Sequence, residues 1–142
     1  MSAPLWRPGL ERMESANLSR FMRFMHDRFG AELPDYATLH DYSVSHPDRF
    51  WTGVWEFCGI RASGDMAPAF EHFEAMPGCR FFPNVQINFA QNLLRFRDER
   101  LAIVARGEDG STRELSYAEL AEQVRRVRAG LAAAGVGPGD RV

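Results

Sequence analysis

A short apolar run followed by a tight-turn signal, near the end of the chain, restricts the fold more than any other feature. Residues 101–105 read Leu-Ala-Ile-Val-Ala, which is a run of strand length. Asp109-Gly110 then favours a tight turn, so that residues 112–115 can pair back as a second antiparallel strand. The sequence therefore predicts a β-hairpin in this region.

A capped amphipathic helix is predicted directly after the hairpin. Ser116 and Glu119 have the spacing of a capping box. Apolar residues then recur on one helical face, at Leu120, Val124, Val127 and Leu131. Gly135 tolerates the left-handed conformation that closes a helix, and residues 137–140 favour a turn. Because a hairpin, a helix and a new apolar start resemble the beginning of an α/β sheet, we expect a truncated sheet with exposed apolar faces.

The first hundred residues are richer in Phe, Trp, Met and His, and they predict a mostly helical segment after an extended start. Apolar periodicity and capping signals predict helices from Ser15 to Gly30, over 36–43, from Pro47 to Gly59 and over 88–94. Pro68, Pro77, Gly78 and Pro83 indicate loops in residues 60–87, with one short helix around 70–76. The periodic aromatic and methionine side chains are expected to form the core.

Composition excludes several classes of protein. The 142 residues are 45% hydrophobic with a net charge of -2, which is typical of a folded domain rather than a disordered chain. Seventeen basic against nineteen acidic residues leave no surplus for phosphates, so we expect no nucleic-acid partner. No apolar run approaches the ~20 residues of a membrane helix, so we expect no membrane partner. Two cysteines make no disulfide framework, which favours a cytoplasmic protein.

All seventeen basic residues are arginine, and the sequence contains no lysine. A Walker-A phosphate loop requires Gly-Lys-Ser/Thr, and Schiff-base chemistry requires a lysine amine. Chemistry of either kind must therefore come from outside this chain.

Four side chains suggest a metal site in the second and third predicted helices: His40, Asp41, His46 and Asp48. Structural zinc sites generally use tighter Cys and His pairs, and the two cysteines lie far away without a Cys-x-x-Cys spacing. We therefore predict no metal-binding residues in this chain.

Two cysteines and one glycine-rich segment are the remaining candidates. Cys58 falls on the apolar face of a predicted helix, which favours a buried, inert thiol, whereas the Pro-Gly loop around Cys79 favours exposure of its side chain. Residues 135–140 superficially resemble a phosphate-binding loop, but that fingerprint follows a strand and opens a helix, the reverse of the order here. We predict no catalytic and no cofactor-binding residue among positions 1–142.

Several short motifs follow one another in a characteristic order: Leu5-Trp6-Arg7-Pro8, Tyr42-Ser43-Val44, Pro47-Asp48-Arg49-Phe50-Trp51, Trp55-Glu56-Phe57, Phe82-Pro83-Asn84, Asn88-Phe89-Ala90-Gln91-Asn92-Leu93-Leu94, Leu115–Leu120 and Gly135–Val142. Over nearly the whole chain they resemble the N-terminal part of the acetoacetate–CoA ligase (acetoacetyl-CoA synthetase) family, within the adenylate-forming acyl-CoA synthetases. The last two motifs are shared across the superfamily. The first motif and the run at 88–94 resemble the acetoacetate branch, although Phe89 and Gln91 replace its usual Tyr and Glu.

The resemblance implies an α/β fragment. Residues 1–100 would be the mostly helical N-terminal extension of acetyl-CoA-synthetase-type enzymes, and residues 101–142 the hairpin–helix beginning of the large AMP-binding domain. The implied enzyme joins acetoacetate to CoA through an acyl-adenylate, with ATP, CoA and Mg as partners of the full-length protein. The family's phosphate loop, ribose-binding Asp and catalytic Lys would follow position 142, so we expect this fragment to be inactive. The alternative is a free-standing protein-interaction module without catalysis.

Overall fold

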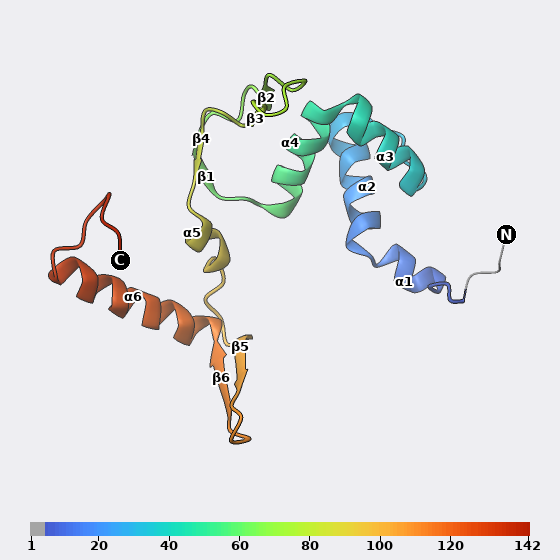
Figure 1. The fold of residues 1–142 in the computed structure, drawn as a ribbon. Helices are drawn as coiled ribbons and strands as arrows, with labels where there is room; N and C mark the ends of the chain where they lie inside the picture. The colour runs from blue at the N-terminus through green and yellow to red at the C-terminus, as the bar shows by residue number, and fades with distance from the viewer. Residues whose placement is uncertain (1–4) are drawn as a thin grey trace. The chain divides into compact units, whose positions relative to one another are not determined.

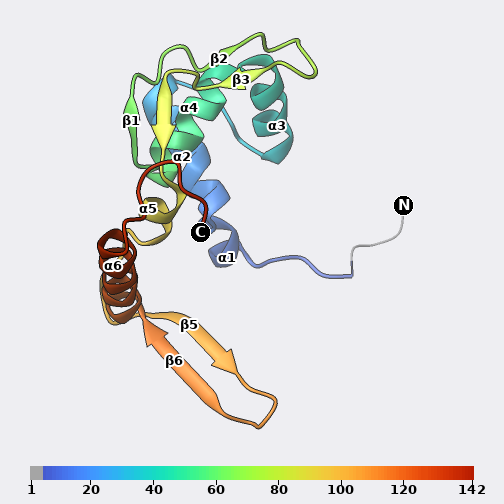
Figure 2. The same ribbon diagram turned by 60° about the vertical axis from the view of Figure 1, so that its left-hand side comes forward.

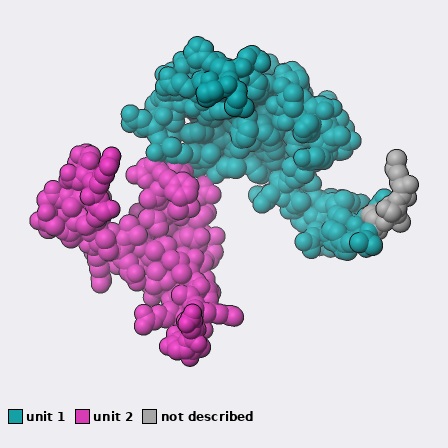
Figure 3. Space-filling model, viewed as in Figure 1, with its two compact units in different colours: residues 1–87 teal, residues 88–142 magenta. Residues whose placement is uncertain are grey.

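The computed structural model describes residues 5–142, and the chain divides into two units, one ending at Ile87 and one spanning Asn88–Val142 (Figure 3). The first unit contains helices α1 (Leu10–Glu14), α2 (Asn17–Phe29), α3 (Tyr36–Ser45) and α4 (Pro47–Cys58), followed by four short strands (Figure 1). The second contains α5 (Phe89–Leu93), strands β5 (Leu101–Arg106) and β6 (Thr112–Ser116), and helix α6 (Tyr117–Ala133). The unit boundary at 87/88 lies ahead of the composition change at residue 100, and the division into an extension and an AMP-binding domain stays a prediction.

The core of the first unit lies where α2 contacts α4 and α4 contacts α3 (Figure 2). Phe21 and Met25 are buried one turn apart on α2, which is the face that the apolar spacing predicts. The Phe21 ring makes edge-to-face contacts with Phe50 and Phe57 of α4, with ring centroids 5.8 and 5.2 Å apart. Leu39 of α3 completes this small cluster.

The structure confirms the helix ends predicted at Gly30 and Gly59, but the helix start predicted at Ser15 is wrong. Gly30 and Gly59 close α2 and α4 in the left-handed conformation, with φ of 68° and 60°. Ser15, predicted as the N-cap of the first long helix, is instead the C-cap of the short helix α1, and its hydroxyl donates to the Arg12 carbonyl. Helix α2 begins after Ala16 without a side-chain cap. Ser15 has right-handed helical backbone angles, φ -79° and ψ -10°, and the extended N-cap position before α2 is taken by Ala16.

Residues 60–87 are mostly loops, as predicted, but they contain two short antiparallel strand pairs in place of the predicted helix. Strand β1 (Ala62–Gly64) pairs with β4 (Val85–Ile87), and β2 (Phe70–Glu71) pairs with β3 (Arg80–Phe81). The helix predicted around 70–76 is therefore wrong. His72 has a φ of 53°, outside the right-handed helical region, which turns the chain away immediately after β2.

The second unit confirms the predicted hairpin, capping box and helix. Strands β5 and β6 are antiparallel, and the Asp109 carboxylate accepts from the Ser111 amide in the turn between them. Ser116 Oγ accepts from the Glu119 amide at 3.2 Å, while Glu119 Oε2 accepts from the Ser116 amide at 2.8 Å. Figures 1 and 2 both show that the N-terminal end of α6 joins the hairpin and that the rest of the helix does not lie along the strands. Within residues 5–142, no helix has the length and apolar character to cross a membrane.

Candidate functional site

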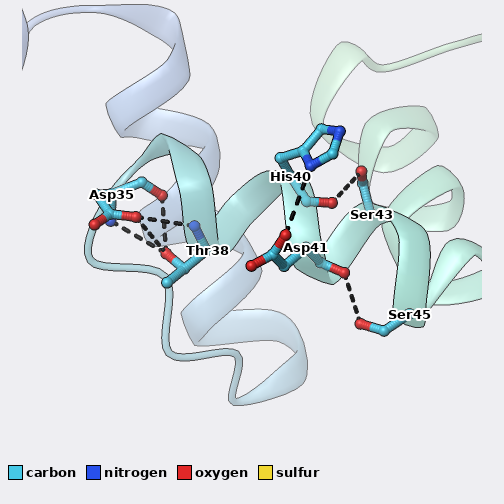
Figure 4. Close-up of polar contacts among 6 residues, drawn as sticks. All are labelled: Asp35, Thr38, His40, Asp41, Ser43 and Ser45. Atoms are coloured by element: carbon cyan, nitrogen blue, oxygen red, sulfur yellow. Dashed lines mark hydrogen bonds and ion pairs between the residues drawn. The ribbon is translucent and has the colours of Figure 1, made fainter.

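The polar side chains of α3 are held by their own helix (Figure 4). Asp35 Oδ1 accepts from the Thr38 amide at 2.9 Å, and this hydrogen bond lowers the pKa of the Asp35 carboxyl. Ser43 and Ser45 donate to the backbone carbonyls of His40 and Asp41, both at 2.7 Å. These groups therefore cap and line α3.

The residues of the metal-site hypothesis do not converge on one point. His40 Nδ1 lies 3.6 Å from Asp41 Oδ1 of the same helix. His46 instead stacks on Tyr42 at a centroid distance of 4.7 Å, and its Nδ1 lies 2.9 Å from Ser45 Oγ. In the part of the chain that the structure describes, no three His, Cys, Asp or Glu side chains are grouped to hold a metal ion.

Cys58 is exposed, so the prediction of a buried thiol is wrong. The side of α4 that packs into the core carries Phe50, Gly53, Val54 and Phe57. Cys58 is the last residue of the helix, where the chain turns at Gly59. Cys79, in the loop before β3, is half-buried.

The glycine-rich segment at 135–140 contains the turn predicted at 137–140, and this turn makes hydrogen bonds within itself. The Gly137 amide donates to Asp140 Oδ2 at 2.7 Å, and the Asp140 amide donates to the Gly137 carbonyl at 3.2 Å. An anion-binding loop needs free amides that converge on the ligand. Here a carboxylate of the same turn already occupies the Gly137 amide.

An open apolar groove of about 700 Å³ lies along α6 in the second unit, and we call it the α6 groove. Its apolar lining consists of Leu120, Val124, Val127, Leu131, Val136 and Pro138. The Val127 side chain is 62% exposed, although it belongs to the apolar face of the helix. The sequence predicted this face; the closure of the groove by Val136 and Pro138 follows from the chain turning back after Gly135.

A charged face of α6 carries a compact arginine–glutamate cluster. Glu122 accepts from Arg125 Nε and from Arg126 Nε, each at 2.7 Å. These two hydrogen bonds lower the pKa of the Glu122 carboxyl to about 2. The charges lie on a solvated surface, where individual ion pairs contribute little stability.

Known proteins resemble this chain in sequence and in fold. No protein-family model matches the chain. An acetoacetyl-coenzyme A synthetase of Rhizobium meliloti is 41% identical over 140 residues, 98% of this chain and 21% of its own length. A malonamoyl-CoA synthetase of Penicillium aethiopicum is 32% identical over 97% of this chain and 20% of its own length.

The fold has a similar counterpart among solved structures. A structure of acetoacetyl-CoA synthetase from Streptomyces lividans matches 99% of this chain with a TM-score of 0.87 and 36% identity. That match covers 22% of the solved chain. The chain thus spans about a fifth of the length of the relatives it matches. The family resemblance is confirmed, and so is the expected α/β fragment, a mostly helical part followed by a hairpin and a helix.

Proposed function

We propose that this chain, which corresponds to the N-terminal part of acetoacetyl-CoA synthetases, is the N-terminal section of an ATP-dependent acetoacetate–CoA ligase. The proposed reaction converts acetoacetate, ATP and CoA into acetoacetyl-CoA, AMP and pyrophosphate. The observation that carries the proposal is the match of nearly the whole chain, in sequence and in fold, to enzymes of that name. The proposed location is the cytoplasm.

The residues of this chain do not fit the sites for ATP, CoA or Mg. The sequence has no lysine to contact a phosphate, and the turn at 137–140 bonds to its own Asp140. Within residues 5–142, no cluster of carboxylates is arranged for a divalent cation. We therefore assign the nucleotide, CoA and Mg sites to polypeptide outside this chain, and we derive no catalytic step from its residues.

The contribution of this chain is then structural. The small α2–α4 core folds the first unit around buried aromatic contacts. The second unit supplies a hairpin and a capped helix, the elements with which an α/β layer begins. Similarity to both an acetoacetyl- and a malonamoyl-CoA synthetase fits a scaffold role, in which the choice of acid is made elsewhere.

The native gene product tests the proposal. An antibody raised against residues 15–60 would isolate it from source cells for intact mass and for an assay of acid-dependent AMP release. We expect a species several times heavier than 16.1 kDa that forms AMP with acetoacetate and CoA. The isolated 142-residue chain, as the matched control, should form none.

Three results would contradict this proposal. A native species of 16.1 kDa without activity would favour the free-standing interaction module. A heavy species that activates malonamate, acetate or propionate in place of acetoacetate would overturn the acid assignment. Turnover by the isolated chain would overturn its assignment as a catalytically silent scaffold.

A further inference from the structure

We propose that residues 96–100 form a clasp that sets the direction in which α6 leaves the β5–β6 hairpin, with Arg100 as its positioning residue. This segment connects α5 to β5, and its backbone lies beside the first turn of α6 (Figures 1 and 2). The clasp lies entirely within the second unit, so it is independent of the proposed function.

The backbone of the clasp binds the first amides of α6. The first N–H groups of a helix have no acceptor within the helix itself. In α6, the Tyr117 amide donates to the Arg100 carbonyl at 3.0 Å. The next amide, of Ala118, donates to the Asp98 carbonyl, also at 3.0 Å. One hydrogen bond would leave the helix free to pivot, whereas two bonds from consecutive amides to carbonyls two residues apart fix its first turn.

The side chain of Arg100 joins the clasp to the helix. Its Nε and Nη2 donate to the two carboxylate oxygens of Asp98, at 2.9 and 2.7 Å. Its Cζ also lies 4.4 Å from the ring centroid of Phe96 and 5.8 Å from that of Tyr117. The two rings are in edge-to-face contact, with centroids 5.7 Å apart. A planar guanidinium can bind a carboxylate with two hydrogen bonds and face aromatic rings at the same time, which a lysine ammonium cannot do.

The direction of α6 depends on these contacts because the rest of the helix does not lie along the strands (Figures 1 and 2). Ala121, close to the first turn, is the buried residue of the helix. At about 1.5 Å per residue, the 17 residues of α6 extend about 25 Å from the clasp. A rotation of about 20° at the first turn would therefore move the far end of the helix by about 9 Å.

Pulsed electron paramagnetic resonance on the 142-residue chain tests the role of Arg100. With Cys58 and Cys79 replaced by serine, nitroxide labels are attached at two exposed positions, through Thr112→Cys on the hairpin and Ala133→Cys at the end of α6. Dilution with unlabelled chain removes distances between copies. We expect a narrow distance distribution in this parent chain. In Arg100→Ala the width should increase at least about twofold, because the length of the helix amplifies any rotation at its first turn.

Arg97→Ala is the matched control. Arg97 is an exposed arginine of the same segment, and within residues 5–142 its side chain makes neither an ion pair nor a ring contact with α6. This variant should keep the parent distribution. Asp98→Asn removes the carboxylate but keeps the carbonyl that binds the Ala118 amide, so it should broaden the distribution less than Arg100→Ala does.

Two further measurements separate a change of direction from a loss of structure. Far-ultraviolet circular dichroism should be the same in all variants, because the strands and α6 keep their own hydrogen bonds. The carbon-13 titration midpoint of the Asp98 carboxyl should rise toward 3.8 in Arg100→Ala, because the hydrogen bond from Arg100 is the main cause of its lowered pKa.

An unchanged distribution in Arg100→Ala, or equal broadening in Arg97→Ala, would overturn the assignment of Arg100. A broad distribution in the parent chain would overturn the clasp itself. If Arg100→Ala loses its helical signal, Asp98→Asn decides the question. Broadening in that variant with an intact helix would support the clasp, and the parent distribution would contradict it.

Discussion

The sulfur of Met25 on α2 lies too close to residue 53 on α4 to leave room for a β-carbon there. The glycine at position 53 therefore makes space for Met25, whose side chain is fully buried in the core. A β-carbon at position 53 would also crowd the ring of Phe29 at 3.3 Å. The requirement for glycine here is space and not backbone conformation, because Gly53 lies within a regular helix.

Gly53→Ala should destabilise the first unit. Overpacking a well-filled core typically costs about 1–3 kcal/mol in the free energy of unfolding. The control is Gly130→Ala in α6, where no atom lies within 4 Å of the added carbon. Alanine in an exposed helix should stabilise by about 0.5–1 kcal/mol. Thermal unfolding followed by near-ultraviolet circular dichroism checks both, and equal shifts for the two variants would contradict the packing argument.

Ser116→Ala should loosen the first turn of α6. Ser116 is only 6% exposed and makes both hydrogen bonds of the capping box with Glu119. Loss of such a cap costs about 1 kcal/mol. Hydrogen exchange of the amides at 117–120 should become faster in this variant, while Ser116→Thr, which keeps the hydroxyl, should preserve protection. Unchanged exchange in the alanine variant would show that the cap does not hold this turn.

Acidification should weaken α6 between about pH 4.5 and pH 2. The pKa of Glu122 falls from 4.5 to about 2 in the folded helix because it accepts hydrogen bonds from Arg125 and Arg126. In that window the unfolded chain binds more protons than the folded chain, so stability from this group is complete above pH 4.5 and is lost toward pH 2. The contribution is small because the cluster is exposed to screening by solvent and salt.

Carbon-13 titration of the side-chain carboxyl groups measures the midpoint for Glu122 directly. The double variant Arg125→Ala and Arg126→Ala should return it toward 4.5, the ordinary value for glutamate. High salt should raise it in the parent chain. A midpoint near 4.5 in the parent chain would show that Glu122 does not accept these hydrogen bonds from Arg125 and Arg126 in solution.

Arg28→Gln should have little effect on stability, although this residue joins two core helices. Its guanidinium makes two hydrogen bonds to the Glu56 carboxylate, at 2.9 and 3.2 Å, and the side chains are 52% and 31% exposed. Exposed pairs of this kind contribute little to stability, because solvent and salt screen the charges. Chemical denaturation should therefore separate this variant clearly from Gly53→Ala, and a loss as large as that of Gly53→Ala would be inconsistent with a solvent-screened pair.

Local signals in the sequence predicted the elements whose hydrogen bonds are local. The capping box at Ser116, the turn at Asp109-Gly110 and the helix ends at Gly30 and Gly59 depend on residues a few positions apart. The family resemblance was also readable from ordered motifs alone. Prediction was wrong where a short helix that was not predicted ended at the expected cap, as at Ser15, or where backbone conformation broke an apparent helix, as at His72.

The sequence by itself determined the long helices of the first unit, the hairpin and capped amphipathic helix of the second, the absence of lysine and the resemblance to acetoacetyl-CoA synthetases, because each depends on residues close together in the chain. Tertiary structure alone decided that Met25 packs against Gly53, that Cys58 is exposed and that Val136 and Pro138 close the α6 groove. Those outcomes depend on which surfaces meet after the chain has turned back on itself, and burial is a property of the assembled fold rather than of a sequence interval.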